Sequence, residues 1–186
     1  MESDGKTLLT TSRFRVEEVT QTLASGKSHQ RVVIRHPGAV AIIPMIDSEH
    51  VCLIRNYRIA VRETLIEIPA GTLEPNEPPE RTAERELIEE TGFRAARITK
   101  LHAFFLSPGV MDERMHLFLA EGLEPVGSAL EAGEEIENWI VPWPQAIDMI
   151  FDGQIQDAKT IVGLLYYDRI RKRSSTALKR IGSESS

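Results

Sequence analysis

Residues 71–93 read GTLEPNEPPERTAERELIEETGF, and they contain the clearest helix pattern in the chain. Its central part, RTAERELIEET, contains no helix breaker and predicts a helix. We expect Asn76 to cap that helix, and Pro78 and Pro79 to lie in its first turn, where backbone N–H groups have no helical partner. Gly92 supplies the left-handed residue that ends a helix.

Three carboxylates crowd one side of the predicted helix. With about 100° of rotation per residue, Glu90 lies about 40° from Glu86 on one side, and Glu89 lies about 60° from it on the other. Like charges one turn apart destabilise a helix by about 0.2–0.5 kcal/mol per pair. The positive charge of Arg85 offsets part of this cost.

Two interpretations of this acidic stripe stay open on the residue pattern alone. One is a charged face exposed to solvent. The other is a divalent-cation site, because Mg²⁺ takes oxygen ligands and rests on one or two carboxylates plus the phosphates of a substrate. Glu86 and Glu90, one turn apart on one face, could hold such an ion. No cluster of cysteine and histidine accompanies them in the sequence, which disfavours zinc.

Composition narrows the class of protein. At 186 residues we expect one domain with at most a short appendage. The single cysteine, Cys52, excludes an internal disulfide and fits a reducing cytoplasm. Neither an apolar leader after Met1 nor a long apolar run is present, so we expect no secretory signal and no membrane association. The net charge of −6 argues against a general nucleic-acid binder.

The remaining chain predicts further strands and helices around the acidic helix, which indicates a mixed α/β layer fold. The predicted strands are 13–23, 30–35, 39–46, 50–57, a strand ending at 67–69, 98–105, 115–121 and 136–141, and the other predicted helices are 144–151 and 157–171. We expect an N-terminal β arm over 1–36, a main domain over 37–173 and a flexible tail over 174–186.

The whole of residues 71–93 resembles the signature of the Nudix hydrolases. That signature is Gly, five residues, Glu, seven residues, Arg-Glu, an aliphatic residue, any residue, Glu-Glu, any residue, Gly and an aliphatic or aromatic residue, and this chain matches it without a departure. The resemblance implies an α/β/α sandwich with a mixed sheet. It also implies hydrolysis by water of a nucleoside diphosphate linked to another group, with Mg²⁺ or Mn²⁺.

Carried over position by position, the resemblance gives roles to the acidic stretch. Glu86 and Glu90 would bind the metal together with the carbonyl oxygen of Ala70. Arg85 and Glu89 would belong to the catalytic group by fixing the helix and its loop, and a separate acid, Glu77, would tie the loop down.

Three further segments are similar to the ADP-ribose pyrophosphatase branch of the family. They are Arg55-Asn56-Tyr57-Arg58, Glu67-Ile68-Pro69-Ala70-Gly71, and a Ser-Pro-Gly segment whose Pro108 lies sixteen residues after Gly92. Under this resemblance Arg58 would hold pyrophosphate oxygens or the terminal ribose, and Ser107 and Glu113 would contact that ribose. The alternatives are a surface ion pair for Arg58, a tight turn at Pro108 and a solvated loop acid at Glu113.

The family places its catalytic glutamate on a loop before the last strand, which here is residues 128–137. Glu134 aligns best with that glutamate, so we expect it to act as the catalytic base and also to bind metal. The position of a second acid found in some relatives is Ala132 here, so Glu135 or Glu131 would substitute. The alternative is an acidic loop that is only solvated.

The resemblance also implies a homodimer in which two chains exchange their N-terminal sheets. Phe14 would stack on adenine near the interface, and Arg31 would reach the site of the partner chain. The expected reaction is hydrolysis of ADP-ribose to AMP and ribose 5-phosphate. The alternatives are a nucleotide-sugar pyrophosphatase acting on GDP-mannose, and a non-catalytic Nudix module that senses ADP-ribose.

Overall fold

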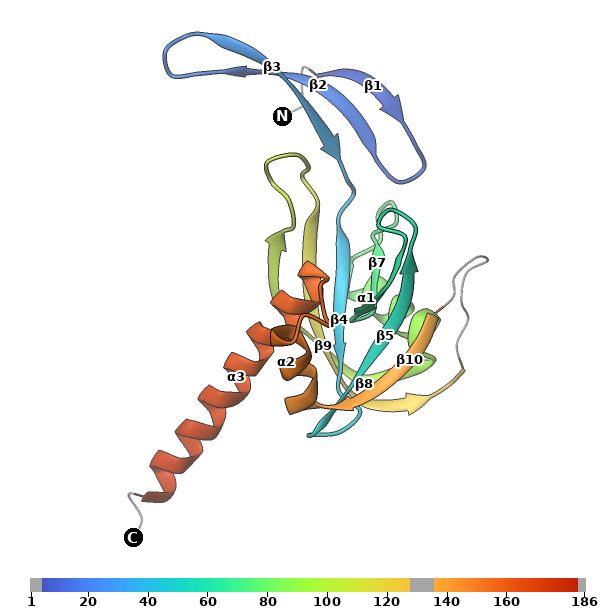
Figure 1. The fold of residues 1–186 in the computed structure, drawn as a ribbon, viewed down its shortest axis with the longest axis vertical. Coiled ribbons are helices and arrows are strands. Elements are labelled where there is room, and N and C mark those ends of the chain that lie inside the picture. The colour runs from blue at the N-terminus through green and yellow to red at the C-terminus, as the bar shows by residue number, and fades with distance from the viewer. Residues whose placement is uncertain (1–4, 128–135, 184–186) are drawn as a thin grey trace.

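The computed structural model describes residues 5–127 and 136–183, with side chains described up to residue 173. The elements in chain order are β1 (Lys6–Thr10), β2 (Arg15–Thr22), β3 (Ser28–Arg35), β4 (Ala39–Pro44), β5 (His50–Arg58), β6 (Glu63–Glu67), β7 (Ala70–Thr72), α1 (Pro79–Thr91), β8 (Phe93–Phe105), β9 (Arg114–Pro125), β10 (Ile136–Pro142), α2 (Trp143–Phe151) and α3 (Ala158–Ser183). They form three sheets, β1-β2-β3, β10-β5-β6 and β7-β4-β9-β8, which Figure 1 shows together with the helices.

Strand β4 is the centre of the fold because all of its residues are buried. It pairs with β9 in parallel and with β7 in the antiparallel sense, so its sheet is mixed. Successive side chains of a strand point to opposite faces. Ala41 and Ile43 pack on the side of α2 and α3, and Val40 and Ile42 pack on the side of α1. The predicted α/β/α layers and mixed sheet are therefore confirmed.

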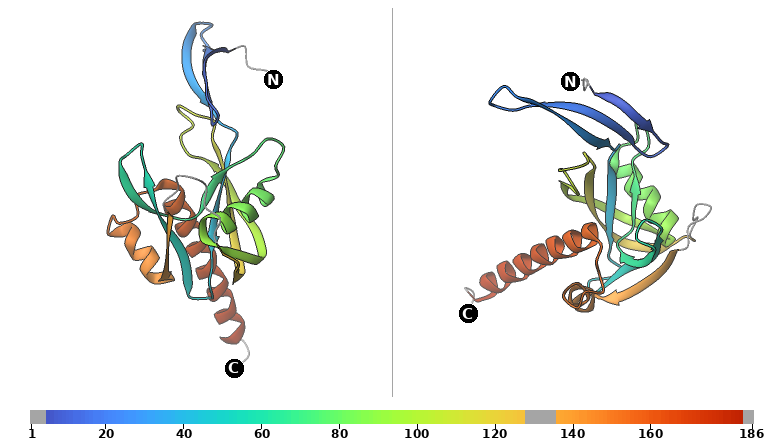
Figure 2. Two further views of the ribbon diagram at one scale, coloured as in Figure 1. Left: turned by 90° about the vertical axis from the view of Figure 1, so that its right-hand side faces the viewer. Right: turned by 45° about the horizontal axis from the view of Figure 1, so that its top comes forward.

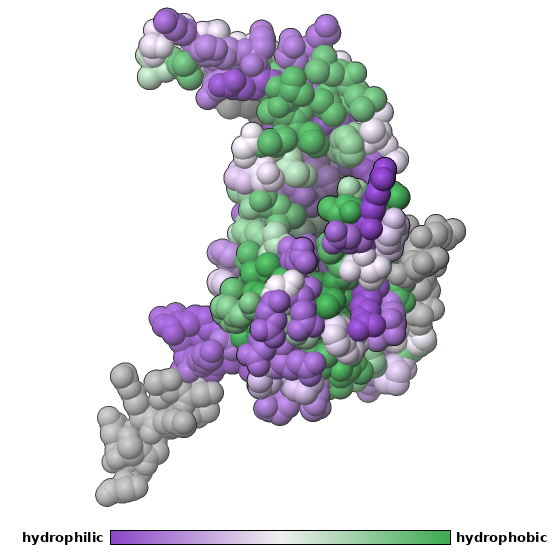
Figure 3. All heavy atoms as spheres, viewed as in Figure 1, coloured by the Kyte–Doolittle hydropathy of each residue, from purple (hydrophilic) through white to green (hydrophobic). Residues whose placement is uncertain are grey.

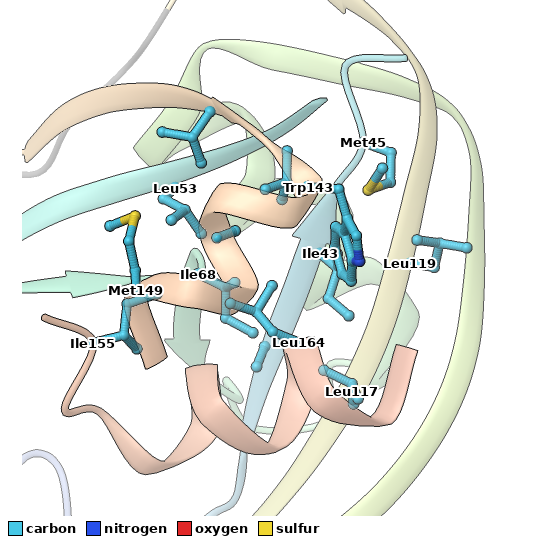
Figure 4. Packing of buried hydrophobic residues seen from close by; sticks show 14 of the residues in the cluster. Ile43, Met45, Leu53, Ile68, Leu117, Leu119, Trp143, Met149, Ile155 and Leu164 are labelled. Carbon is cyan, nitrogen blue, oxygen red and sulfur yellow. The ribbon is translucent and has the colours of Figure 1, made fainter. Parts of the chain in front are cut away.

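The larger core lies between the mixed sheet and the elements that cover it. Figure 4 shows Ile43 of β4, Leu53 of β5, Leu117 of β9, Trp143 of α2 and Leu164 of α3 packed in one cluster. Cys52 is fully buried in β5, and that burial raises the pKa of its thiol to about 12. This cysteine is therefore a small apolar core residue and not a reactive one.

Helix α1 ends where the sequence predicts but begins differently. Gly92 has φ 71°, and its N–H donates to the Ile88 carbonyl, which gives the predicted left-handed stop. The predicted cap is wrong, because Pro78 holds the N-cap position and makes no side-chain cap hydrogen bond. Asn76 instead has φ 65° and belongs to the loop before the helix. An asparagine tolerates that left-handed conformation as well as it caps helices, so its residue type could not separate the two roles.

Other boundaries also differ from the prediction, and for strands the pairing partner contributes to the difference. The strands β1 and β7 were not predicted, β8 begins at Phe93 and not at Ile98, and α3 continues to Ser183 beyond the predicted end at Arg171. Phe93 pairs with Pro125 on β9, so the early start of β8 depends on a strand far along the chain. The flexibility of residues 174–186 stays a prediction, as do the domain boundaries.

The arm formed by β1, β2 and β3 projects from the domain opposite to the end of α3 (Figures 1 and 2). It exposes apolar side chains, with Leu8 47% and Leu9 53% exposed, and Figure 3 shows hydrophobic residues gathered on the part of the arm near β1 and β2. None of the helices in the described residues is long and apolar enough to cross a membrane.

Two adjacent leucines of α3 test how this helix is held on the core. Leu164 is fully buried and Leu165 is 37% exposed. We expect Leu164→Ala to lower the free energy of unfolding by about 2–5 kcal/mol, because it leaves a cavity against the mixed sheet. The matched Leu165→Ala variant should change it by less than about 0.5–1 kcal/mol, measured by denaturant unfolding. Equal losses in the two variants would mean that α3 does not pack as described.

Candidate active site

A cavity of about 830 Å³ lies between the acidic helix and the arm. Its acidic wall comes from α1, with Glu86, Glu89 and Glu90, and from the backbone of β7. Its opposite wall comes from the turn between β1 and β2 and from the end of β3. Arginines also line it, namely Arg13, Arg15, Arg35, Arg58 and Arg85. A cavity with both carboxylates and guanidinium groups suits an anionic ligand that binds together with a cation.

Arg85 holds the acidic wall in place. Its Nη1 donates to Glu86 Oε1 at 2.7 Å and to Glu89 Oε2 at 2.9 Å. Its Nε and Nη2 donate to the two carboxylate oxygens of Glu77 at 3.3 and 3.1 Å. The Arg85 hydrogen bonds hold the pKa of Glu77 below its usual value. One guanidinium thus fixes three carboxylates and brings Arg85, Glu89 and Glu77 together, while their roles in catalysis stay predictions.

The backbone of β7 lies directly against the carboxylates of Glu90 and Glu86. The Ala70 N–H donates to Glu90 Oε2 at 2.8 Å, and Glu90 is only 5% exposed. At Gly71 a Cβ atom would lie 1.9 Å from Cδ of Glu86, so a larger residue there would have to displace the Glu86 carboxylate. Glu86, Glu90 and the Ala70 backbone are therefore brought together, as the sequence predicts.

This set of donors fits a hard divalent cation. Two carboxylates and a backbone carbonyl are oxygen ligands, and Mg²⁺ in proteins binds one or two carboxylates and keeps several waters. Within residues 5–127 and 136–173, no group of three or more His, Cys, Asp and Glu side chains is arranged to hold a metal ion. The candidate ligands are therefore Glu86 and Glu90, and binding by the Ala70 carbonyl stays a prediction from the resemblance.

Arg58 lines the cavity and is anchored behind it. Its Nε and Nη2 donate to Oε1 and Oε2 of Glu67 at 2.7 and 2.6 Å, and Glu67 is 1% exposed. The hydrogen bonds with Glu67 raise the pKa of Arg58, so this group stays charged. Arg58 is therefore ion-paired and borders the cavity, but its partner is buried, so the pair is not the surface ion pair of the alternative interpretation.

Of the other residues predicted to contact substrate, some line the cavity and others do not. Phe14 lines the cavity from the turn between β1 and β2. Ser107, Glu113 and Arg31 are not among its lining residues: the first two flank the turn between β8 and β9, and Arg31 donates to Gln21 on the neighbouring strand of the arm. Glu131, Glu134 and Glu135 lie outside the described residues.

Sequence reasoning missed the residues that join the arm to the domain. Arg35 Nη1 donates to Asp112 Oδ2 at 3.1 Å and its Nε donates to Glu17 Oε2 at 2.9 Å. Asp112 Oδ1 also accepts from the His36 N–H at 2.8 Å. Because Asp112 is distant from Arg35 in the chain, no local pattern could have paired them. This network holds the arm over the cavity of the same chain.

Comparison with known proteins agrees with the site. A model of the NUDIX domain matches residues 35–162. The chain is 40% identical to "ADP-ribose pyrophosphatase" of Bacillus subtilis over 81% of this chain and 82% of that protein. It is 34% identical to "GDP-mannose pyrophosphatase" of Klebsiella pneumoniae over 80% of each.

A solved structure also resembles the fold. The protein described as "Crystal structure of ADP compounds hydrolase" superposes with a TM-score of 0.79 and 26% identity. The match covers 92% of this chain and 93% of that one.

The close approach at Gly71 predicts the effect of one methyl group on cation binding. In Gly71→Ala the new Cβ must displace the Glu86 carboxylate, so we expect the affinity for Mn²⁺ to fall by about tenfold or more. Isothermal titration with Mn²⁺ measures this, and thermal unfolding checks that the variant folds.

A double variant is the control for that experiment. If Gly71→Ala acts through Glu86, then adding it to Glu86→Gln should lower the Mn²⁺ affinity no further. An unchanged affinity in folded Gly71→Ala would contradict the placement of Glu86 at the cation site.

Proposed function

The chain belongs to the NUDIX family and is a hydrolase of that family, and from this premise we propose that it hydrolyses the pyrophosphate bond of ADP-ribose with Mg²⁺, giving AMP and ribose 5-phosphate. The more general activity, hydrolysis of nucleoside diphosphate sugars without a choice of base or sugar, is supported by relatives named for ADP-ribose and for GDP-mannose. The observation that carries the proposal is the cavity in which Glu86 and Glu90 lie against the backbone of Ala70 and Gly71, with arginines on its other walls.

Residues of this chain can do three things for the reaction. Glu86, Glu90 and the Ala70 carbonyl would hold Mg²⁺, and Mn²⁺ could take its place. When bound, such an ion neutralises charge on the phosphate oxygens and lowers the pKa of a water molecule. Arg85 keeps the carboxylates in place, and Arg58 offers a fixed positive charge to the pyrophosphate.

The bond changes of the proposed reaction balance without another reactant. A water oxygen bonds to one phosphorus, the adenosyl one in our proposal, and the bridging P–O bond breaks. The bridging oxygen leaves with the ribose phosphate, and a glutamate takes the proton of the water. We assign that proton transfer to Glu134, which would also bind metal, with Glu135 or Glu131 as substitutes.

The remaining parts of the proposal concern substrate contacts and assembly. Phe14 borders the cavity and could stack on adenine, which supports the assignment of the base to the arm end of the cavity. Ser107, Glu113 and Arg31 are proposed contacts to the terminal ribose and across a homodimer with exchanged N-terminal sheets. The exposed apolar side chains of the arm support such a dimer. A cytoplasmic location is supported only by the single, buried cysteine.

GDP-mannose is the second candidate substrate, because a relative at 34% identity carries that name. Both sugar nucleotides present a pyrophosphate to the same acidic wall and differ in the base and the sugar. The choice between them therefore depends on the arm and on the loop between β8 and β9, and not on Glu86 or Glu90.

A comparison of substrates tests the proposed activity. In single-turnover reactions with Mg²⁺, we expect ADP-ribose to be cleaved faster than GDP-mannose or a diadenosine polyphosphate, and we expect AMP and ribose 5-phosphate as products. A chelator should abolish the reaction, and added Mg²⁺ should restore it. If ADP-ribose were cleaved no faster than the other two compounds, the assignment of the substrate would be wrong.

A pair of glutamates on α1 supplies the matched control. Glu90→Gln keeps the shape and an acceptor for the Ala70 N–H but removes the charge, so turnover should fall by about 100-fold or more with normal folding. Glu84 is 49% exposed and pairs with Arg81, so Glu84→Gln should change turnover by less than about twofold. Full turnover in Glu90→Gln would remove Glu90 from the cation site.

A further inference from the structure

Lys159 is a buried cation to which neither the sequence nor the proposed reaction gives a role. It is the second residue of α3 and is only 7% exposed. Its Nζ contacts Glu67 Oε2 and lies 3.0 Å from Asp157 Oδ2. A lysine is almost never buried without a partner, so its charge must serve the carboxylates that surround it.

Glu67 connects Lys159 to the cavity. Its two carboxylate oxygens accept from Nε and Nη2 of Arg58, and Oε2 also contacts Lys159. Burial alone raises the pKa of Glu67, but the hydrogen bonds from Arg58 and the charge of Lys159 outweigh it and hold that pKa below its ordinary value. Glu67 is therefore a buried, charged carboxylate that pairs with two cations, Arg58 and Lys159.

The hydrogen bonds to Glu67 occupy one edge of the Arg58 guanidinium and leave another edge for a ligand. Glu67 uses the Nε–Nη2 edge of the guanidinium, and the Nη1–Nη2 edge can bind a second anion in the same plane. Arg58 lines the cavity and its side chain is 39% exposed. The orientation of this edge is thus set by Glu67, because two parallel hydrogen bonds fix a planar group.

Lys159 balances the charge behind Arg58. Arg58 and Lys159 are positive and Glu67 and Asp157 are negative, so the group of four is neutral as a whole. Without Lys159, two carboxylates would share one cation. Glu67 would then take up a proton or move, and the positive potential that Arg58 presents to an anion in the cavity would fall.

The position of Lys159 is fixed by the start of α3. Asp157 Oδ2 accepts from the N–H and the hydroxyl of Thr160 at 2.9 and 2.6 Å, which caps the helix. The Thr160 hydroxyl oxygen in turn accepts from the Ile68 N–H at 2.9 Å. The helix end that carries Lys159 is therefore tied to the residue after Glu67, which keeps the backbone of the lysine next to that carboxylate.

We propose that Lys159 is a positioning residue for phosphate binding, acting through Glu67 to hold the guanidinium of Arg58 at the edge of the cavity. This inference rests on the proposed function, in which Arg58 binds the pyrophosphate. It assigns to the start of α3 a part in substrate affinity that is separate from the packing of Leu164.

The first test observes Arg58 without any substrate. In NMR spectra of the ligand-free protein, the Nε–H signal of Arg58, assigned by its loss in Arg58→Lys, should be sharp and shifted by the Glu67 hydrogen bond. We expect Lys159→Met to broaden or move this signal, Lys159→Arg to preserve most of it, and Lys172→Met, on the exposed part of the same helix, to leave it unchanged. Thermal unfolding shows whether each variant is folded. An unchanged Arg58 signal in folded Lys159→Met would overturn the inference.

The second test is a double-mutant cycle on binding. The dissociation constant of ADP-ribose is measured by calorimetry in EDTA for wild type, Arg58→Ala, Lys159→Met and the double variant. We expect Lys159→Met to weaken binding by about fivefold or more in the wild-type background and by less than about twofold in the Arg58→Ala background. Equal weakening in both backgrounds would overturn the inference. A wild-type protein that neither binds nor cleaves ADP-ribose would refute the proposed substrate, while the NMR test would still decide the role of Lys159.

Discussion

The repulsion among neighbouring carboxylates on α1 is the constraint on which the site depends. Glu86, Glu89 and the loop residue Glu77 all lie within hydrogen-bonding distance of the Arg85 guanidinium. A lysine could not reproduce these contacts, because Arg85 makes four hydrogen bonds from three nitrogens and an ammonium has three N–H donors on one nitrogen. The concentration of negative charge is thus compatible with a stable helix, and it is kept at the wall of a cavity.

The second requirement is a backbone segment held between two helices. The Ile68 N–H donates to Thr160 of α3 and the Ala70 N–H donates to Glu90 of α1. Between them the Pro69 carbonyl accepts from the Ile42 N–H of β4. The segment from Glu67 to Gly71 is therefore fixed by hydrogen bonds to α3, α1 and β4. Its first residue, Glu67, pairs with Arg58, and its other end lies against Glu86 and Glu90.

The sequence was most informative where a role depends on residues close in the chain. The spacing of Glu86 and Glu90, the stop at Gly92 and the burial of Cys52 follow from local periodicity or chemistry, and the structure has them as predicted. The cap at Asn76 was wrong because one residue type suits two conformations. The Arg58–Glu67–Lys159 group and the Arg35–Asp112 contact could not be predicted, because the tertiary fold alone brings their members together.

The most direct measurement of the central claim is a crystal structure of the protein with Mn²⁺ and a non-hydrolysable ADP-ribose analogue, with the anomalous signal used to locate the metal. We expect Mn²⁺ at about 2.0–2.3 Å from carboxylate oxygens of Glu86 and Glu90 and from the Ala70 carbonyl, with the pyrophosphate between the metal and Arg58. Metal bound elsewhere, or an analogue whose pyrophosphate lies away from these carboxylates, would contradict it.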